Sequence, residues 1–297
     1  MIRNKNSKKI DKLTSGIDAI PTLPAIVGRV MEIIDDPESS AQDLMEVVNT
    51  DQAIASKILK IANSAFYGLV RKVGSLYHAV MVLGFDEVRN LVVSMTAFNS
   101  FRDLQSDGSF DFRRLWEHSF MCGLAARIIA GNMKISGGEL FVAGLLHDIG
   151  KPAICMILPE AFDEVVKATG PQQMRTADAE KRILGTTHAD VGKILVKKWM
   201  MPENIVDAVG FHHQPAKASD RSGFPIVVHL ADLLAHLSSV TEYALDDQMK
   251  TELFARKTVK LAKSYNINWE KDTVIEHLNT LKAQKEAQSD ILSVLFT

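Results

Sequence analysis

One stretch of the chain, Glu139-Leu-Phe-Val-Ala-Gly-Leu-Leu-His-Asp-Ile-Gly-Lys151, predicts both the fold class and the candidate site. Residues 139–147 are nearly all apolar, which predicts a helix buried on all sides. The acidic residue Asp148 directly follows His147 at the end of this helix. Burying an ionised carboxylate there is costly unless a cation lies beside it, and packing gives no reason for it. The stretch therefore predicts a core helix whose end carries metal ligands.

Helical periodicity continues on both sides of this stretch, with apolar residues recurring every three or four positions. The flanking helices that this periodicity predicts span residues 112–130, 188–199, 202–211, 226–237, 248–264 and 272–294. Nearer the N-terminus, Ser40, Asp51 (or Thr50) and Ser75 are typical N-cap residues and predict three more helices. Strand alternation and Asn-Gly hairpin signals are missing from the sequence. We therefore expect an all-α protein.

Composition excludes several classes of protein. Apolar residues make up 46% of the 297 residues and charged residues 24%, which is ordinary for a globular protein and excludes wholesale disorder. The net charge of −2 gives no overall attraction to nucleic acid or anionic lipid. No apolar run reaches the ~18 residues of a membrane span. Cys122 and Cys155 lack C-x-x-C spacing, so we expect a soluble cytoplasmic protein without disulfides.

The chain divides into four predicted parts. A basic segment without an apolar run predicts a flexible tail, and the polar stretch Gln105–Ser109 predicts a loop between two helical parts. The predicted parts are a tail over 1–12, an N-terminal helical part over 13–106, a metal-binding helical core over 107–240 and C-terminal helices over 241–297.

Residues 75–101 also have the outline of a helix-turn-helix, which raises the alternative of a DNA-binding module. The charged residues in this segment are Asp86, Glu87 and Arg89, with a net charge of −1. A recognition helix faces phosphates and depends on Lys and Arg contacts. Because two helices joined by glycine are common in helical cores, we expect no DNA binding.

Five of the nine histidines and two aspartates form an ordered series through the middle of the chain. The predicted metal ligands are His118, His147, Asp148, His188, His212, His213 and Asp232. Imidazole and carboxylate are ligands of divalent ions such as Fe, Mn, Zn, Ni or Mg. Seven ligands suit one octahedral ion, or two ions bridged by a carboxylate, for which Asp148 is the natural candidate.

Other residues with ligand chemistry are interpreted as core residues. A single His on an apolar face is usually a packed, hydrogen-bonded residue, and this applies to His78, His229 and His236. His229 and His236 flank Asp232 on one helix face, so they could instead orient it. Cys122 lies one turn after His118 and is interpreted as a small core residue.

Three further motifs carry a resemblance to a known family. They are Ile20-Pro-Thr-Leu-Pro24, the segment 51–65 beginning Asp-Gln-Ala-Ile-Ala-Ser-Lys, and the segment 79–91 beginning Ala-Val-Met-Val-Leu-Gly. With the His-Asp doublet, residues from about 13 to 215 resemble the HDOD domain of the HD superfamily. The resemblance implies an all-α fold, a role in bacterial signalling and a protein partner. HDOD proteins generally lack the full HD ligand set and do not catalyse reactions, but this sequence retains the set.

All seven predicted ligands fall where the related HD-GYP phosphodiesterases place metal ligands, which implies one or two divalent ions, with iron favoured. The resemblance also implies that Asp148 and Lys151 are catalytic residues, because Lys151 matches a lysine that contacts the substrate phosphate. Gln214-Pro215 follows the His-His doublet in place of the Glu-x-x-Asp-Gly-x-Gly-Tyr-Pro loop, and Gly223-Phe224-Pro225 comes about three residues late. Arg114 stands one turn before His118, where some HD-GYP enzymes carry a carboxylate ligand.

These features predict a signalling protein with an intact His/Asp metal site that binds or hydrolyses a phosphorylated nucleotide. Two alternatives stay open. One is a metal-dependent phosphohydrolase proper, and the other is a non-catalytic protein-interaction module in which the metal stabilises the fold.

Overall fold

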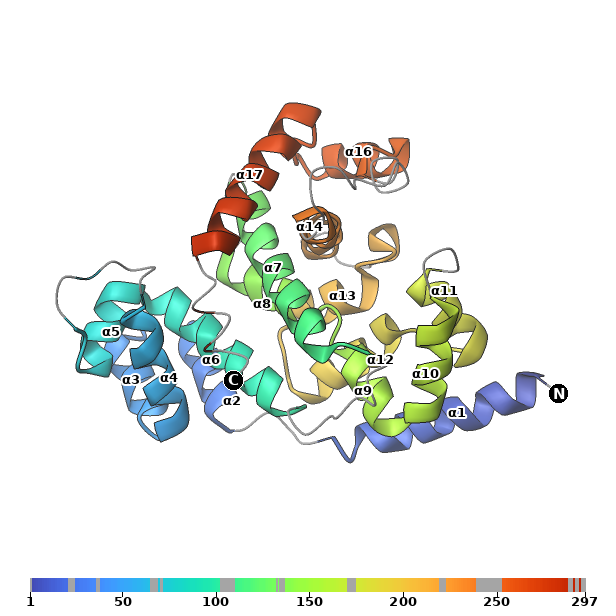
Figure 1. The fold of residues 1–297 in the computed structure, drawn as a ribbon, viewed down its shortest axis with the longest axis horizontal. Coiled ribbons are helices and arrows are strands. Elements are labelled where there is room, and N and C mark those ends of the chain that lie inside the picture. Colours follow the sequence, from blue (N-terminus) through green and yellow to red (C-terminus); the bar gives the residue numbers. More distant parts are fainter. Residues whose placement is uncertain are drawn as a thin grey trace.

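Helices make up the secondary structure throughout the part of the chain that this computed structural model describes (Figure 1). The described residues are 2–20, 25–35, 38–64, 69, 72–101, 110–131, 133, 137–169, 175–218, 223–238, 253–287, 291 and 294. No strand occurs among them, which confirms the predicted all-α fold. The predicted loop at 105–109 lies outside these residues, so the division at 106/107 stays a prediction.

The N-terminal helices form one group, seen at the left of Figure 1. They are α2 (Ala25–Asp35), α3 (Ala41–Val48), α4 (Gln52–Ala62), α5 (Leu76–Leu83) and α6 (Phe85–Asn99). The predicted N-caps are confirmed: Ser40 forms a capping box with Asp43, the Asp51 carboxylate accepts from two backbone amides of α4, and Ser75 accepts from a backbone amide of α5. Each cap satisfies amide groups that the first helical turn leaves unpaired.

Helix α6 connects this group to the rest of the protein. Its residues Val88, Leu91 and Val92 are buried, and it packs against α8 (Gly137–Leu146). The Arg89 side chain passes so close to Gly138 that a Cβ at this glycine would collide with the guanidinium group. The second helix of the helix-turn-helix outline is therefore part of the core.

The centre of the protein is built from α7 (Phe112–Ala130), α8, α13 (Glu203–Phe211) and α14 (Phe224–Ser238), with α17 (Lys271–Ala287) packed across α7 and α14 (Figure 1). Helices α7 and α8 approach closely at two glycines. A Cβ on Gly144 would lie 2.8 Å from the carbonyl oxygen of Cys122, and a Cβ on Gly123 would lie 2.8 Å from that of Phe141. This close crossing positions the predicted ligand His118 of α7 next to His147 and Asp148 at the end of α8.

A second layer contains helices that the sequence did not predict: α9 (Gly150–Ile157), α10 (Pro159–Ala168) and α11 (Thr176–Ile183). Helix α12 (His188–Lys198) packs against α9 and α13. The α8–α9 stretch Gly137–Ile157 is long and apolar enough to cross a membrane by length and composition alone, but 78% of an apolar 18-residue window within it is buried inside the fold. It is therefore typical of a core element.

The N-terminal segment differs from the predicted flexible tail over 1–12, because residues Ile2–Ile17 form helix α1. Leu13 and Ile17 are buried, and α1 contacts α9 and α12. The Lys198 ammonium donates to the carbonyl oxygens of Ile17, Asp18 and Ile20 at 2.8, 2.9 and 3.1 Å. Long-range contacts of this kind cannot be read from a local run of basic residues.

The C-terminal segment is helical where the sequence predicts helices over 248–264 and 272–294. Helix α16 spans Arg256–Ser264 and follows a turn at Phe254, so the first predicted helix is interrupted there. Helix α17 spans Lys271–Ala287, and the described residues Ile291 and Val294 beyond it are also helical. Residues 248–252 lie outside the described residues. Ile291 and Val294 belong to the hydrophobic core.

Candidate metal centre

The structure brings the seven predicted ligands together from five segments. His118 lies on α7 and Asp232 on α14, whereas His147 and Asp148 form the turn between α8 and α9. His188 is the first residue of α12, and His212 and His213 follow α13. Gly150 allows this arrangement, because a Cβ there would collide with the backbone carbonyl oxygen of His188.

The first group of ligand atoms belongs to His118, His147 and Asp232. These atoms lie within 4.8 Å of one another. The Oδ1 atom of Asp232 is 3.0 Å from Nε2 of His118 and 3.7 Å from Nε2 of His147. Two imidazoles and a carboxylate thus face one small volume.

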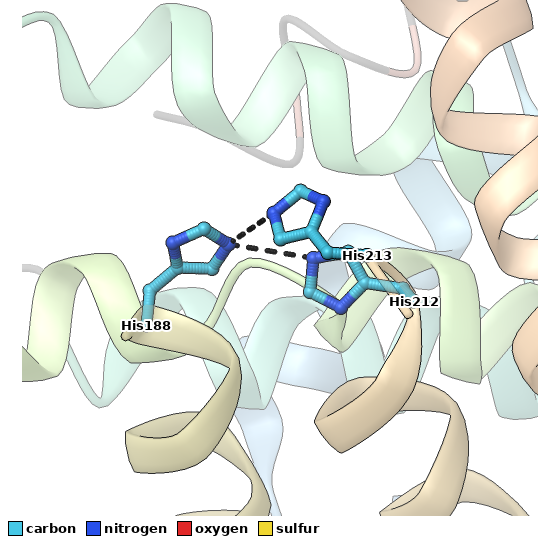
Figure 2. Close-up of side chains that lie close together, drawn as sticks. All are labelled: His188, His212 and His213. Atoms are coloured by element: carbon cyan, nitrogen blue, oxygen red, sulfur yellow. Dashed lines mark hydrogen bonds between the residues drawn. The ribbon is translucent and has the colours of Figure 1, made fainter. Parts of the chain in front are cut away.

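The second group consists of His188, His212 and His213, whose rings converge in Figure 2. The Nε2 atom of His188 lies 2.9 Å from Nε2 of His213 and 3.3 Å from Nε2 of His212. His188 enters from the start of α12 and the doublet from the end of α13.

Asp148 lies between the two groups. Its Oδ2 atom is 3.4 Å from Nε2 of His147, and its Oδ1 atom is 3.2 Å from Nε2 of His188. Asp148 also shares a compact set of possible ligand atoms with His147 and His212. One carboxylate oxygen therefore points toward each group, as a bridging carboxylate requires.

The hydrogen bonds at Nδ1 fix how three of these rings are protonated. His147 Nδ1 lies 2.7 Å from the Gly144 carbonyl oxygen, His212 Nδ1 lies 2.8 Å from the Val209 carbonyl oxygen, and His188 Nδ1 lies 2.7 Å from the Glu180 carboxylate. Carbonyl and carboxylate oxygens only accept, so each Nδ1 carries a proton, and in the neutral form of each ring the lone pair is on Nε2. The lone pairs of His188 and His212 therefore face each other across 3.3 Å.

This arrangement fits a divalent cation. Opposed lone pairs repel unless a cation or a proton lies between them. The Nε2 atom of His147 is buried and has no hydrogen-bond partner among the described residues, which is rare for a buried polar atom. Metal-binding histidines usually donate a hydrogen bond from one ring nitrogen to a neighbouring oxygen, which leaves the other ring nitrogen to bind the ion.

Burial keeps several of the imidazoles in the neutral form that binds metal. Loss of hydration lowers the pKa of His118 to about 4. Burial and then the neighbouring His188 lower the pKa of His213 to about 3, while burial and His213 hold the pKa of His212 well below its usual value. Neutral rings at these positions are ready to accept a cation at neutral pH.

The carboxylates stay ionised for the opposite reason. Burial would raise the pKa of Asp148, but His147 and Lys151 outweigh it and hold this pKa well below its usual value. Burial likewise opposes ionisation of Asp232, yet His236 and His118 hold its pKa well below the usual range. Against burial, the Asp148 carboxylate raises the pKa of His147.

Lys151, the predicted phosphate contact, lies one turn after Asp148 on α9. Its Nζ atom is 2.5 Å from Oδ2 of Asp148, and its side chain is mostly buried. Burial lowers the pKa of Lys151, but Asp148 reverses this and raises it above its usual value. A permanent positive charge therefore lies beside the bridging position.

Glu180 is a supporting residue that the sequence analysis missed. It is fully buried on α11 and accepts hydrogen bonds from Nδ1 of His188 at 2.7 Å and from the His188 backbone amide at 2.8 Å. The polar sequence of α11 gave no helical apolar stripe to predict that helix. The hydrogen bonds between Glu180 and His188 join residues eight positions apart on two different helices, so no local sequence pattern predicted them.

Two histidines interpreted as packing residues also support the centre. His236 Nδ1 lies 3.0 Å from Oδ1 of Asp232, and His229 donates from Nδ1 to the carbonyl oxygen of His212 at 2.8 Å. Their spacing from Asp232 was the signal that could have identified them. Cys122 is fully buried beside His147, and burial raises the pKa of its thiol, so it is a core residue as predicted.

Comparison with solved structures shows the same fold in proteins that carry little sequence identity. An HDOD domain protein of unknown function from Geobacter sulfurreducens has a TM-score of 0.78, with 24% identity over 99% of this chain and 98% of that chain. A candidate signal transduction protein from Marinobacter aquaeolei has a TM-score of 0.80, with 22% identity over 98% of this chain and 66% of that chain. A candidate phosphohydrolase from Shewanella amazonensis has a TM-score of 0.73, with 20% identity over 96% and 98%.

Comparison with curated proteins finds an uncharacterized protein of Treponema pallidum, 25% identical over 217 residues. The aligned region covers 71% of this chain and 41% of that protein, so the chain spans less than half of the relative's length. The HDOD domain model matches residues 20–215, which is most of the chain. The chain therefore belongs to the HDOD domain family.

Proposed function

We propose that this HDOD protein is a signalling protein that binds two divalent metal ions in its His/Asp cluster and uses them to bind and hydrolyse a phosphorylated nucleotide or related phosphate ester. The observation that carries the proposal is the position of Asp148, with one carboxylate oxygen directed at each ligand group. In two-metal hydrolases a bridged pair of ions lies about 3.5–4 Å apart.

The ligands divide naturally between the two ions. His118, His147 and Asp232 would hold one ion, and His188, His212 and His213 the other, with Asp148 shared. Five imidazoles among seven ligands favour iron, manganese, zinc or nickel over magnesium, and family resemblance favours iron. Bound ions of this kind lower the pKa of water and polarise a phosphoryl group.

Lys151 would contribute charge to the same chemistry. Its ammonium group lies at the bridging carboxylate, where it can neutralise phosphoryl oxygens as negative charge develops on them. Asp148 and Lys151 are accordingly the residues we assign to catalysis. The names of the similar proteins, which include a candidate phosphohydrolase and a candidate signal transduction protein, are consistent with this proposal.

A second candidate is a non-catalytic regulatory module, in which the ions only stabilise the fold and a partner protein binds to the surface of the module. The burial of His147, His188 and His212, with exposed fractions of 1%, 0% and 0%, favours this alternative. Ions held there would tie the ends of α8, α12 and α13 together. Such a protein would lose cooperative unfolding when its metal is removed.

Elemental analysis of the untagged protein, combined with a hydrolysis assay on a panel of nucleotides and phosphate esters, tests the proposal. We expect two ions per chain and turnover of at least one phosphate ester, with both reduced in Asp148→Asn. The matched control is His277→Gln, which removes a histidine of α17 outside the cluster and should leave both unchanged. A fully loaded protein without turnover would overturn hydrolysis and leave the structural role.

A further inference from the structure

A cavity of about 510 Å³ opens beside the candidate metal centre. Its walls come from α7 with its N-cap, from α14 and from Lys285 on α17, which crosses α7 in Figure 1. His118 and His236 form the part of the wall that belongs to the metal centre. The His236 side chain is 52% exposed, so solvent reaches the first ligand group from this side.

The cavity lining carries more positive than negative charge, because Arg113, Arg114 and Lys285 outnumber the carboxylates of Asp111 and Glu117. Arg113 is paired with Glu117 at 3.0 Å, and the Asp111 carboxylate accepts from the backbone amide of Arg114 as the N-cap of α7. The side chains of Arg114 and Lys285 have no ion-pair partner in the part of the chain that the structure describes. With Arg113 paired to Glu117, these two cations face the single carboxylate of Asp111, which leaves an excess of one positive charge in the cavity.

Arg114 is placed to act together with the metal centre. It precedes His118 by four residues on α7, so the two side chains lie on the same helix face about 6 Å apart along the axis. A guanidinium group matches two phosphate oxygens with parallel hydrogen bonds, and an ammonium group adds a second positive charge. The cavity has the size of a small-molecule site, for which about 300–1,000 Å³ is typical.

We propose that this cavity binds a small molecule with at least two linked phosphoryl groups, one at the metal centre and the other held by Arg114 and Lys285. The proposal rests on the proposed function for the metal-bound phosphoryl group and deepens it by naming the ligand class and two binding residues. Because Lys285 lies beyond residues 20–215, the C-terminal helix supplies a specificity residue from outside the matched HDOD domain.

Calorimetric titration of the full chain with inorganic pyrophosphate and with orthophosphate tests this assignment. Metal content is measured first, and each titration is repeated after chelation. We expect Arg114→Gln and Lys285→Gln each to weaken pyrophosphate binding by roughly 10-fold or more, as loss of a charged hydrogen bond does. Orthophosphate, which needs only the metal centre, should bind these variants within about threefold of the wild type.

Lys282→Gln is the matched control, because it removes a lysine one turn earlier on α17 that does not line the cavity. It should bind pyrophosphate like the wild type. Arg114→Lys and Lys285→Arg keep the charge and should recover most of the affinity, which separates a binding role from a folding role. The assignment would be overturned if Arg114→Gln and Lys285→Gln bound pyrophosphate as tightly as the control Lys282→Gln. Absence of metal in the wild type would overturn the proposed function, and any Arg114 dependence that survives chelation would still support the cavity.

Discussion

In helices α2 to α5, the buried residues among those described are apolar, and polar side chains lie at the surface or cap helix ends. In the helices around the metal centre, by contrast, His147, Asp148 and His188 are almost completely buried. The N-terminal group is thus stabilised by ordinary packing and capping. The centre buries charged groups, and the free-energy cost of removing them from water is not offset by packing alone. This difference is the reason why we place the proposed function in the second region.

The largest effect should come from the bridging carboxylate. Asp148→Asn removes the negative charge that faces both ligand groups, so we expect loss of at least one ion. Mutation of a residue that only hydrogen-bonds to a metal ligand costs roughly 10–100-fold in activity, and we expect the rate of hydrolysis to fall by more than this. Circular dichroism should show an unchanged helical fold. Full activity in this variant would contradict the bridging role.

Metal removal should separate the two regions directly. A ligand at 100 times its Kd stabilises the folded state by about 2.7 kcal/mol. We expect chelation to increase amide hydrogen exchange in α8, α12, α13 and α14, while α2 to α5 exchange as before. Equal increases in both regions would show that the centre is not the local source of stability.

Glu180 offers a finer test, because it reaches the centre through its hydrogen bonds to His188. Glu180→Gln should lower metal affinity by roughly 10–100-fold, as loss of an outer hydrogen-bond partner does. Asp178→Asn on the same helix is the control, since that side chain is exposed. Isothermal titration calorimetry with the metal compares the two variants. Equal metal affinities would show that Glu180 does not support metal binding.

The metal-free protein should lose stability as the pH falls. Folded His118 and His213 have pKa values of about 4 and about 3, below the 6.5 of an unperturbed histidine. Between pH 6.5 and about 4 the unfolded chain therefore binds more protons, so the free energy of unfolding decreases as the pH falls. His147 contributes with the opposite sign, because Asp148 raises its pKa. Urea midpoints measured across this range test the net slope, which His118→Gln should flatten.

The smallest effect belongs to the N-terminal group. Ser40→Ala removes the capping box of α3 and should lower the free energy of unfolding by about 1 kcal/mol. Metal content and pyrophosphate affinity should not change. Any loss of metal in this variant would break the separation between the two regions.

Local patterns in the sequence were enough for much of the fold. The apolar spacing of residues 112–130 predicted α7 to the residue, and Ser40 and Ser75 marked helix starts correctly. Helix α11 was missed because its sequence is mostly polar and has no apolar stripe that would predict a helix. Only Ala179 and Glu180 are buried in it, and their contacts lie with other parts of the chain. Helix α1 was missed for a similar reason, since Lys198 and the core hold it in place.

The seven residues that the structure brings together were also chosen from local signals, because a buried carboxylate beside histidine favours a cation. That they bind metal stays a prediction. The division of these residues into two groups was not predictable. That division depends on how closely α7 and α8 cross at Gly144, and such a distance is set by tertiary packing. Glu180 and the cavity at Arg114 and Lys285 likewise join residues far apart in the chain.

The metal content of the untagged protein tests the central claim most directly. Elemental analysis should find two divalent ions per chain in the wild type, at most one in Asp148→Asn, and two in the control His277→Gln. A wild-type protein that remains metal-free after incubation with iron, manganese, zinc and nickel, yet unfolds at the same temperature, would contradict the account.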